Sequence, residues 1–255
     1  MTAILAIRVN DGVVLAAEGR TLITRNSDGQ PLAGFDQAGK VFPICAAPPV
    51  AFAACGAGSV GGLSMRFLAG ELEDSFRTVQ PAGFQEVLER AANLIHHRSE
   101  DALCPEHNRR PDFDWLIGGY EGQAPLPCLW RLSVRHGRPR APERLERLLV
   151  WSGEGANAIA RLIGGVAPEI PDILRNEIPD RPTVERLVQL LERVELDLVH
   201  PEMPLGTAVD LARLLLDTAI GIERLRGAMP SAGGSICIGV VDRHRGFRYL
   251  SGEPL

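Results

Sequence analysis

Two adjoining segments near the start of the chain are apolar on both faces, and they limit the fold more than any other feature. Residues 2–9 (TAILAIRV) and 13–17 (VVLAA) are nearly all apolar, and Asn10-Asp11-Gly12 between them has the composition of a tight turn. This pattern predicts a β-hairpin. Strands without a polar face must be covered on both sides, so the hairpin requires one layer of structure above it and another below it.

Similar patterns place the remaining elements. Further strands are expected at 40–45, 50–55, 113–117, 128–134, 148–151, 235–241 and 247–250. Helices are expected after Ser59 with Leu63, Phe67, Leu68, Leu72 and Phe76 inward, from Pro81 to about residue 95, from 155 through Ile163, from Thr183, and over 205–225. Strands and helices in alternating blocks favour two stacked sheets between layers of helices. No Gly-, Ser- or charge-rich linker divides the chain, so a single domain over residues 1–255 is expected.

Charge and cysteine content exclude several partners. The chain has 27 basic and 32 acidic side chains, a net charge of −5 and no run of Lys or Arg, which argues against a nucleic-acid partner. Its 5 cysteines are scattered without a Cys-x-x-Cys pair, which favours a reducing cytoplasm. Residues 41–65 carry no charge, yet their prolines and glycines would break a membrane-spanning helix. No membrane association is expected.

Thr2 is the first candidate for chemistry. Removal of Met1 would expose a residue that carries both a hydroxyl nucleophile and, in its own α-amine, a base with a reference pKa of about 7.7–8.0. The alternative is that threonine is simply a common second residue.

Six motifs follow one another at compatible spacing. They are the segment 2–20, Gly39-Lys40-Val41-Phe42, residues 50–56 (VAFAACG), residues 114–122 (DWLIGGYEG) with Cys128-Leu-Trp, Ser152-Gly153, and residues 232–238 (AGGSICI). Together they cover nearly the whole chain and resemble proteasome β-type subunits of the N-terminal nucleophile hydrolase family. This resemblance implies an α+β fold, a four-layer α-β-β-α sandwich, and threonine endopeptidase activity that needs no cofactor or metal.

The resemblance also implies roles for particular residues. Thr2 would attack the peptide carbonyl, Lys40 would lower the pKa of the nucleophile, and Glu18 would hold that lysine. The N–H of Gly56 would stabilise the oxyanion, and Ser152 would hydrogen-bond the α-amine or its water. The remaining positions carried over are a supporting Arg20 and a small, uncharged substrate pocket of Thr21, Ala38, Ala54 and Gly58. Without catalysis, Lys40 and Glu18 would be an ordinary ion pair, and Gly56 would serve close packing.

Several positions depart from the family pattern. Glu18 stands where the family has Asp, and the residues between Glu18 and Lys40, with Asn26, Asp28, Gly29 and Pro31, are expected to form an extended loop. The family's late Asp-x-x-Ser is replaced by Met229 and Ala232, and residues 164–203 are expected to add a helical elaboration. These departures resemble the divergent bacterial branch, HslV-like or Anbu-like proteasome homologues, more than a standard β subunit.

The expected function is a self-compartmentalising threonine peptidase that acts on peptides or unfolded proteins. A homo-oligomeric ring or spiral is expected, and an unfoldase partner stays unidentified. The alternatives are a catalytically silent ring subunit and an amidase for small molecules. Two rival sites are weaker: His97, Cys104 and His107 as zinc ligands without a fourth partner, and residues 56–62 as a phosphate loop without its Lys-Ser/Thr ending.

Overall fold

The computed structural model describes residues 2–24, 31–101, 111–122, 124–193, 195–226 and 230–252. Two antiparallel sheets dominate them. In the five-stranded sheet the order is β13 (Leu149–Ser152), β1 (Ile4–Val9), β2 (Gly12–Glu18), β14 (Ile236–Asp242) and β15 (Gly246–Ser251). In the six-stranded sheet the order is β11 (Arg138–Pro139), β10 (Pro127–Arg135), β9 (Phe113–Tyr120), β6 (Pro49–Gly56) and β5 (Val41–Ala46), and β12 (Glu143–Leu145) pairs with β10.

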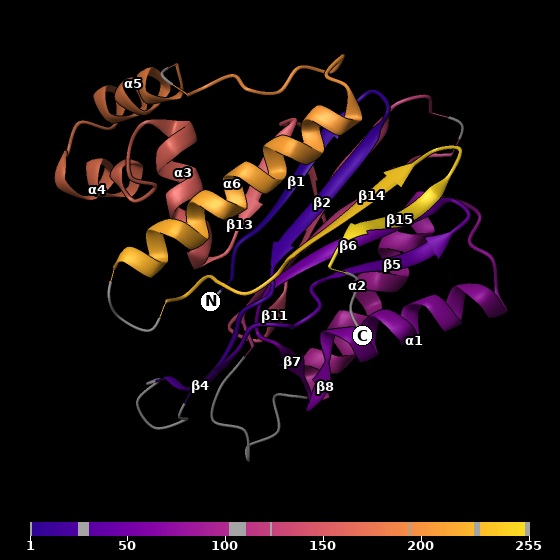
Figure 1. Cartoon of the computed structure of the whole chain (residues 1–255). Coiled ribbons are helices and arrows are strands. Elements are labelled where there is room, and N and C mark those ends of the chain that lie inside the picture. The colour runs from indigo at the N-terminus through magenta and orange to yellow at the C-terminus, as the bar shows by residue number, and fades with distance from the viewer. Residues whose placement is uncertain are drawn as a thin grey trace.

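Six α-helices lie in two groups within the described ranges (Figure 1). Helices α1 (Met65–Thr78) and α2 (Phe84–Asp101) lie beside the six-stranded sheet. The short helix η1 (Glu154–Ala156), α3 (Asn157–Gly164) and α6 (Leu205–Leu225) lie beside the five-stranded sheet, with α4 (Ile170–Glu177) and α5 (Arg181–Glu192) at one end of the molecule.

Three apolar clusters hold these elements together. Side chains of α1 and α2 such as Leu68 and Leu88 pack with Phe52 of the six-stranded sheet. A second cluster, which includes Ile4, Leu15 and Leu116, lies between the two sheets, and a third joins the five-stranded sheet to α3 and α6. Apolar burial of this extent is the main stabilising term of folding.

The hairpin of β1 and β2 confirms the prediction made from its two apolar faces. Ile4 and Ala6 belong to the cluster between the sheets, whereas Leu5 and Ile7 belong to the cluster beneath α3 and α6. Every residue of β2 is buried. The hairpin is therefore covered on both sides, as its composition requires.

Local structure differs from expectation at the start of α1, at the start of α2, which begins at Phe84 rather than near Pro81, and between Glu18 and Lys40. Helix α1 begins after Ser64, whose Oγ accepts a hydrogen bond of 3.2 Å from Phe67 N, so Ser59 is not its cap and Phe67 is exposed. Ser59 instead belongs to a small hairpin, β7 (Ser59–Val60) with β8 (Leu63–Ser64), so residues 56–62 do not lead directly into a helix as a phosphate loop would.

The third difference concerns the residues between Glu18 and Lys40. In place of the expected extended loop they contain a second hairpin, β3 (Thr21–Thr24) with β4 (Pro31–Phe35). Asn26, Asp28 and Gly29 lie outside the described residues. Thr21 and Phe35 are paired across this hairpin, and both line a cavity that opens beside Thr2.

Three further observations concern the helices, the cysteines and residues 164–203. Within the described ranges, no helix combines the length and the apolar character needed to cross a membrane. The four described cysteines are buried, and Cys104 lies outside the described residues. Residues 164–203 contain helices α4 and α5.

Candidate functional site

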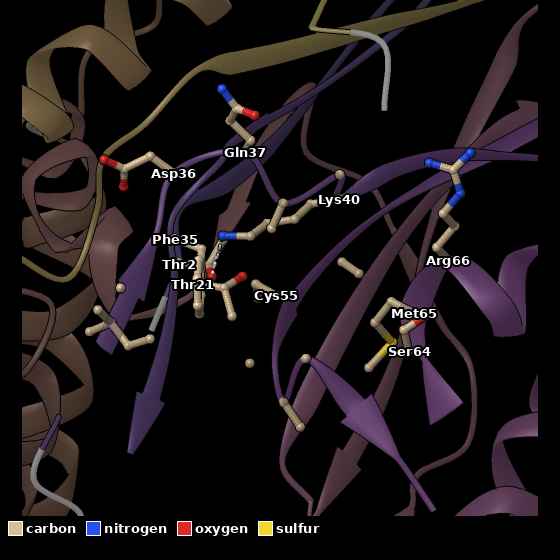
Figure 2. Close-up of a pocket in the computed structure, with 18 residues that line it drawn as sticks. Thr2, Thr21, Phe35, Asp36, Gln37, Lys40, Cys55, Ser64, Met65 and Arg66 are labelled. Atoms are coloured by element: carbon tan, nitrogen blue, oxygen red, sulfur yellow. Dashed lines mark hydrogen bonds between the residues drawn. The ribbon is translucent and has the colours of Figure 1, made fainter. Parts of the chain in front are cut away.

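Thr2, Lys40 and Glu18 come together at the junction of the two sheets. Thr2 lies just before β1, Glu18 is the last residue of β2, and Lys40 is the residue before β5. Lys40 Nζ donates to Thr2 Oγ1 at 2.8 Å (Figure 2). It also donates to Glu18 Oε1 at 3.0 Å. Its third hydrogen bond goes to the carbonyl oxygen of Arg20, so all three ammonium donors have partners.

Glu18 is fully buried and its carboxylate is surrounded by donors. Oε1 accepts from Ala3 N at 3.2 Å in addition to Lys40, and Oε2 accepts from Arg20 N and Gly233 N, each at 2.8 Å. A buried carboxylate is stable only when it is paired and hydrogen-bonded in this way. The longer glutamate side chain therefore reaches Lys40 while its oxygens also bind the backbone just before β1, β3 and β14.

Burial lowers the pKa of Lys40, and the nearby Glu18 carboxylate partly opposes this shift. A lysine with a lowered pKa exchanges a proton more readily near neutral pH. The ammonium also places positive charge next to Thr2 Oγ1, which favours the ionised form of that hydroxyl.

A cavity of about 680 Å³ opens beside Thr2. Lys40, Cys55 and Gly56 line it together with Thr2, and Met65 lies across it in Figure 2. All four predicted pocket residues are part of its wall: Thr21, Ala38, Ala54 and Gly58.

The wall also contains charged residues that the uncharged pocket prediction did not include. Asp36 lies on it and accepts two hydrogen bonds from Arg20, at 2.6 Å from Nε and 2.8 Å from Nη2. The bond from Arg20 lowers the pKa of Asp36. Arg66, from α1, is exposed at the cavity and has no ion pair among the described residues.

Ser152 lies at the end of β13, opposite Ile4 across the β1–β13 pair. Its hydroxyl donates to Asp114 Oδ2 at 2.5 Å, a partner that sequence reasoning did not identify. Asp114 also accepts from Ser133 Oγ at 2.5 Å and from Arg135 Nη2 at 2.6 Å. The available signal was a single charge inside β9, a strand whose eight residues are all buried.

Gly153 keeps the backbone of Thr2 in place. Its φ is +97°, and a Cβ there would lie 1.9 Å from the carbonyl oxygen of Thr2 and 2.9 Å from its carbonyl carbon. Gly155 N donates to the same oxygen at 3.2 Å. No side chain fits at Gly153 without moving the N-terminus.

Gly153→Ala is therefore expected to lower the free energy of unfolding by more than a left-handed conformation alone, which costs about 1–2 kcal/mol. Gly62→Ala is the matched control, since Gly62 has a φ of +80° and a Cβ added to it would meet nothing within 4 Å. Urea unfolding of both variants gives the comparison. Equal destabilisation would show that the contact with Thr2 carries no extra cost.

Among the residues that the structure describes, no three His, Cys, Asp or Glu side chains gather closely enough to hold a metal ion. His97 is exposed on α2, and Cys104 and His107 lie outside the described residues. Met1 and Met229 also lie outside the described residues.

Comparison with solved structures identifies similar folds. Anbu (ancestral beta-subunit) from Yersinia bercovieri matches with a TM-score of 0.56 and 12% sequence identity, over 99% of this chain and 88% of that chain. Anbu from Hyphomicrobium sp. strain MC1 matches with a TM-score of 0.55 and 16% identity, over 98% of this chain and 88% of that chain. No protein-family model and no curated protein sequence matches. The fold is thus similar to that of Anbu (ancestral beta-subunit).

Proposed function

We propose that this chain is a threonine endopeptidase of the proteasome type whose nucleophile is Thr2. The observation that carries the proposal is the contact of 2.8 Å between Thr2 Oγ1 and Lys40 Nζ, on the wall of a cavity large enough for a substrate side chain. Glu18 fixes the lysine from the other side at 3.0 Å. A hydroxyl next to a buried, oriented cation is prepared to lose its proton.

The reaction proceeds in two halves. The α-amine of Thr2 takes the proton of its own hydroxyl as Oγ1 forms a bond to the peptide carbonyl carbon, and Lys40 stabilises the developing alkoxide. The N–H of Gly56 donates to the oxyanion, a kind of interaction worth about 3–4 kcal/mol in another hydrolase. The C–N bond then breaks, the amine product leaves with that proton, and an ester on Thr2 remains. Water hydrolyses the ester with the α-amine again acting as base.

This mechanism requires removal of Met1, because only then is the base a free amine. Thr2 is 3% exposed in the described structure, and its hydroxyl already lies beside Lys40. We infer that removal of Met1 frees the α-amine of Thr2 as the base without a rearrangement of Thr2 and Lys40. The direct test compares peptide hydrolysis by chains that begin at Thr2 with hydrolysis by chains that keep Met1; equal rates would contradict the mechanism.

We further infer a single-domain, four-layer α-β-β-α sandwich of the Anbu-like or HslV-like branch, active in the cytoplasm on peptides or unfolded proteins. The similarity in fold to Anbu and the three apolar clusters between successive layers support this inference. Helices on both outer sides leave surface for contacts that build a homo-oligomeric ring or spiral. Light scattering that finds only a monomer of about 27.6 kDa at micromolar concentration would contradict the assembly.

The pocket of Thr21, Ala38, Ala54 and Gly58 is expected to accept a large apolar side chain before the scissile bond. Each buried methylene adds about 0.8 kcal/mol of transfer free energy, and Met65 and Phe35 extend the apolar wall. Arg66 lies on the same wall without an ion pair among the described residues, so cleavage after acidic residues is the competing outcome.

Gly58→Val tests this assignment with little risk to the fold, because a Cβ there meets only Thr21 Cγ2, at 3.8 Å. In a panel of fluorogenic peptides that differ only at the residue before the cleaved bond, hydrolysis after Leu, Phe and Tyr should dominate. It should fall in Gly58→Val and in Ala54→Phe and persist in Ala54→Ser. An unchanged profile in both enlarged variants would refute the pocket.

A second candidate function is a catalytically silent subunit that forms part of the wall or gate of an assembly. Ala232 favours it, because this buried residue occupies the position of the family's late serine and offers no hydroxyl. Absence of hydrolysis by chains that begin at Thr2, in assemblies that still form, would select this function.

A further inference from the structure

Asp114 is the one charged residue in strand β9, and it is 7% exposed. Three side chains donate to its carboxylate. Ser133 and Arg135 of β10 reach Oδ1, and Ser152 of β13 reaches Oδ2. The bond from Ser152 crosses from the five-stranded sheet to the six-stranded sheet, so Asp114 links the two sheets at the end where Thr2 lies.

Ser152 connects this carboxylate to the N-terminus. It faces Ile4 across the β1–β13 pair, and the glycines that follow it, Gly153 and Gly155, contact the carbonyl of Thr2. Ser152 has one O–H, and that hydrogen is donated to Asp114. Its oxygen can therefore only accept from other groups, and it has two acceptor sites. The Cys55 thiol is hydrogen-bonded to the Ser152 side chain and occupies one of these sites, which leaves the other for an N–H of the amine.

We propose that Asp114 is a positioning residue for the α-amine of Thr2 and acts through Ser152. With its hydrogen held by Asp114, Ser152 accepts an N–H from the amine and cannot donate to the nitrogen. The nitrogen lone pair stays free for the proton of Thr2 Oγ1. The proposal rests on the proposed function, and it supplies from β9 a carboxylate that the sequence lacks at Met229.

The charge of Asp114 should also reach the amine. Burial alone would raise the pKa of Asp114, but hydrogen bonds from Ser133 and Ser152 and the charge of Arg135 hold it below the ordinary value. The aspartate is therefore ionised at neutral pH. A nearby negative charge stabilises an ammonium and raises its pKa, and removal of that charge lowers the pKa.

Other titratable groups surround this end of the molecule. They are Lys40 and Glu18 on the cavity side, the Cys55 thiol on β6, Asp112 just before β9, Arg135 on β10 and Glu154 on η1. Burial raises the pKa of Cys55 to about 11, so this thiol is neutral when the amine titrates. The other titratable groups are the same in wild type and in Asp114→Asn. The difference in α-amine pKa between these two proteins therefore measures the effect of the Asp114 charge.

The test measures the pKa of the α-amine itself in full-length chains that begin at Thr2. Competitive acetylation across pH, followed by mass spectrometry of the N-terminal peptide, gives this pKa without any need for catalysis. Asp114→Asn keeps the shape of the side chain and removes its charge, so the pKa should fall by up to about one unit. Arg135→Gln removes the opposing cation from a half-exposed position, so the pKa should rise. Ser133→Ala leaves the charge and the bond to Ser152 in place and should leave the pKa unchanged.

Opposite shifts in Asp114→Asn and Arg135→Gln support the proposal, and Arg135→Gln alone still decides it if Asp114→Asn does not fold. An α-amine pKa that is the same in wild type and in the folded variants would overturn it. The kinetic counterpart is an acidic limb of kcat/KM that moves to lower pH in Asp114→Asn. Shifted α-amine pKa values without peptide hydrolysis would contradict the proposed function and leave this inference standing. Peptide hydrolysis with an unshifted α-amine pKa would support the proposed function and overturn this inference.

Discussion

Thr2→Ala is expected to abolish peptide hydrolysis, because this one substitution removes the hydroxyl that forms the acyl-enzyme. The fold should survive, since Thr2 contributes a small side chain and the adjoining strand β1 is held by β2 and β13. Fluorogenic peptide hydrolysis at pH 7, together with a thermal unfolding curve of each protein, provides the measurement.

Lys40→Met is the companion variant, since it keeps the length of the side chain and removes the charge beside Thr2 Oγ1. Loss of one positioned donor that stabilises developing negative charge costs about 10²–10³ in rate. Peptide hydrolysis retained in Thr2→Ala would show that a residue other than Thr2 is the nucleophile. Activity retained in Lys40→Met alone would leave Thr2 as nucleophile and remove the lysine from the mechanism.

Glu18→Gln is expected to produce the largest loss of stability among single substitutions at the site. Glu18 is 0% exposed, and its carboxylate holds the ammonium of Lys40 and three backbone N–H groups. Removing one member of a buried ion pair costs about 3–5 kcal/mol, because the other charge is left without a partner. Urea unfolding at pH 7 measures the change.

Glu73→Gln provides a matched control, because the pair of Glu73 and Arg77 is exposed on α1 with an N–O distance of 2.7 Å. An exposed pair of this kind contributes about 0–1 kcal/mol. The double variant Glu18→Gln with Lys40→Met should recover part of the loss, since no buried cation remains. Equal unfolding free energies for Glu18→Gln and Glu73→Gln would show that the buried pair does not stabilise the fold.

Most strands could be predicted because each is specified by the apolar pattern of its own residues. The apolar hairpin of β1 and β2 needs cover on both faces whatever surrounds it. The candidate residues Thr2, Glu18 and Lys40 were indicated by the resemblance of six motifs to those of proteasome β-type subunits, without knowledge of their contacts. The start of α1 could not be predicted with the same success. Ser59 and Ser64 both suit a helix cap, and the choice is made by the β7–β8 hairpin that occupies the residues between them.

Side-chain contacts between residues that are far apart in the chain could not be predicted from the sequence either. Asp114 is separated from Ser152 by 38 positions, and its role depends on how the two sheets stack. Asp36 likewise reaches Arg20 through the β3–β4 hairpin, where an extended loop was expected. A charge within a buried strand indicates that a partner is needed, but it does not name the partner.

In the proposed mechanism Thr2, freed of Met1, provides both nucleophile and base. A peptide epoxyketone tests it most directly, because this warhead needs the hydroxyl and the α-amine of one residue. After incubation of chains that begin at Thr2, intact-mass analysis should find one inhibitor per chain, with the N-terminal peptide modified and no adduct in Thr2→Ala. An unmodified mass in fully processed, folded protein, or an equal adduct in Thr2→Ala, would contradict the account.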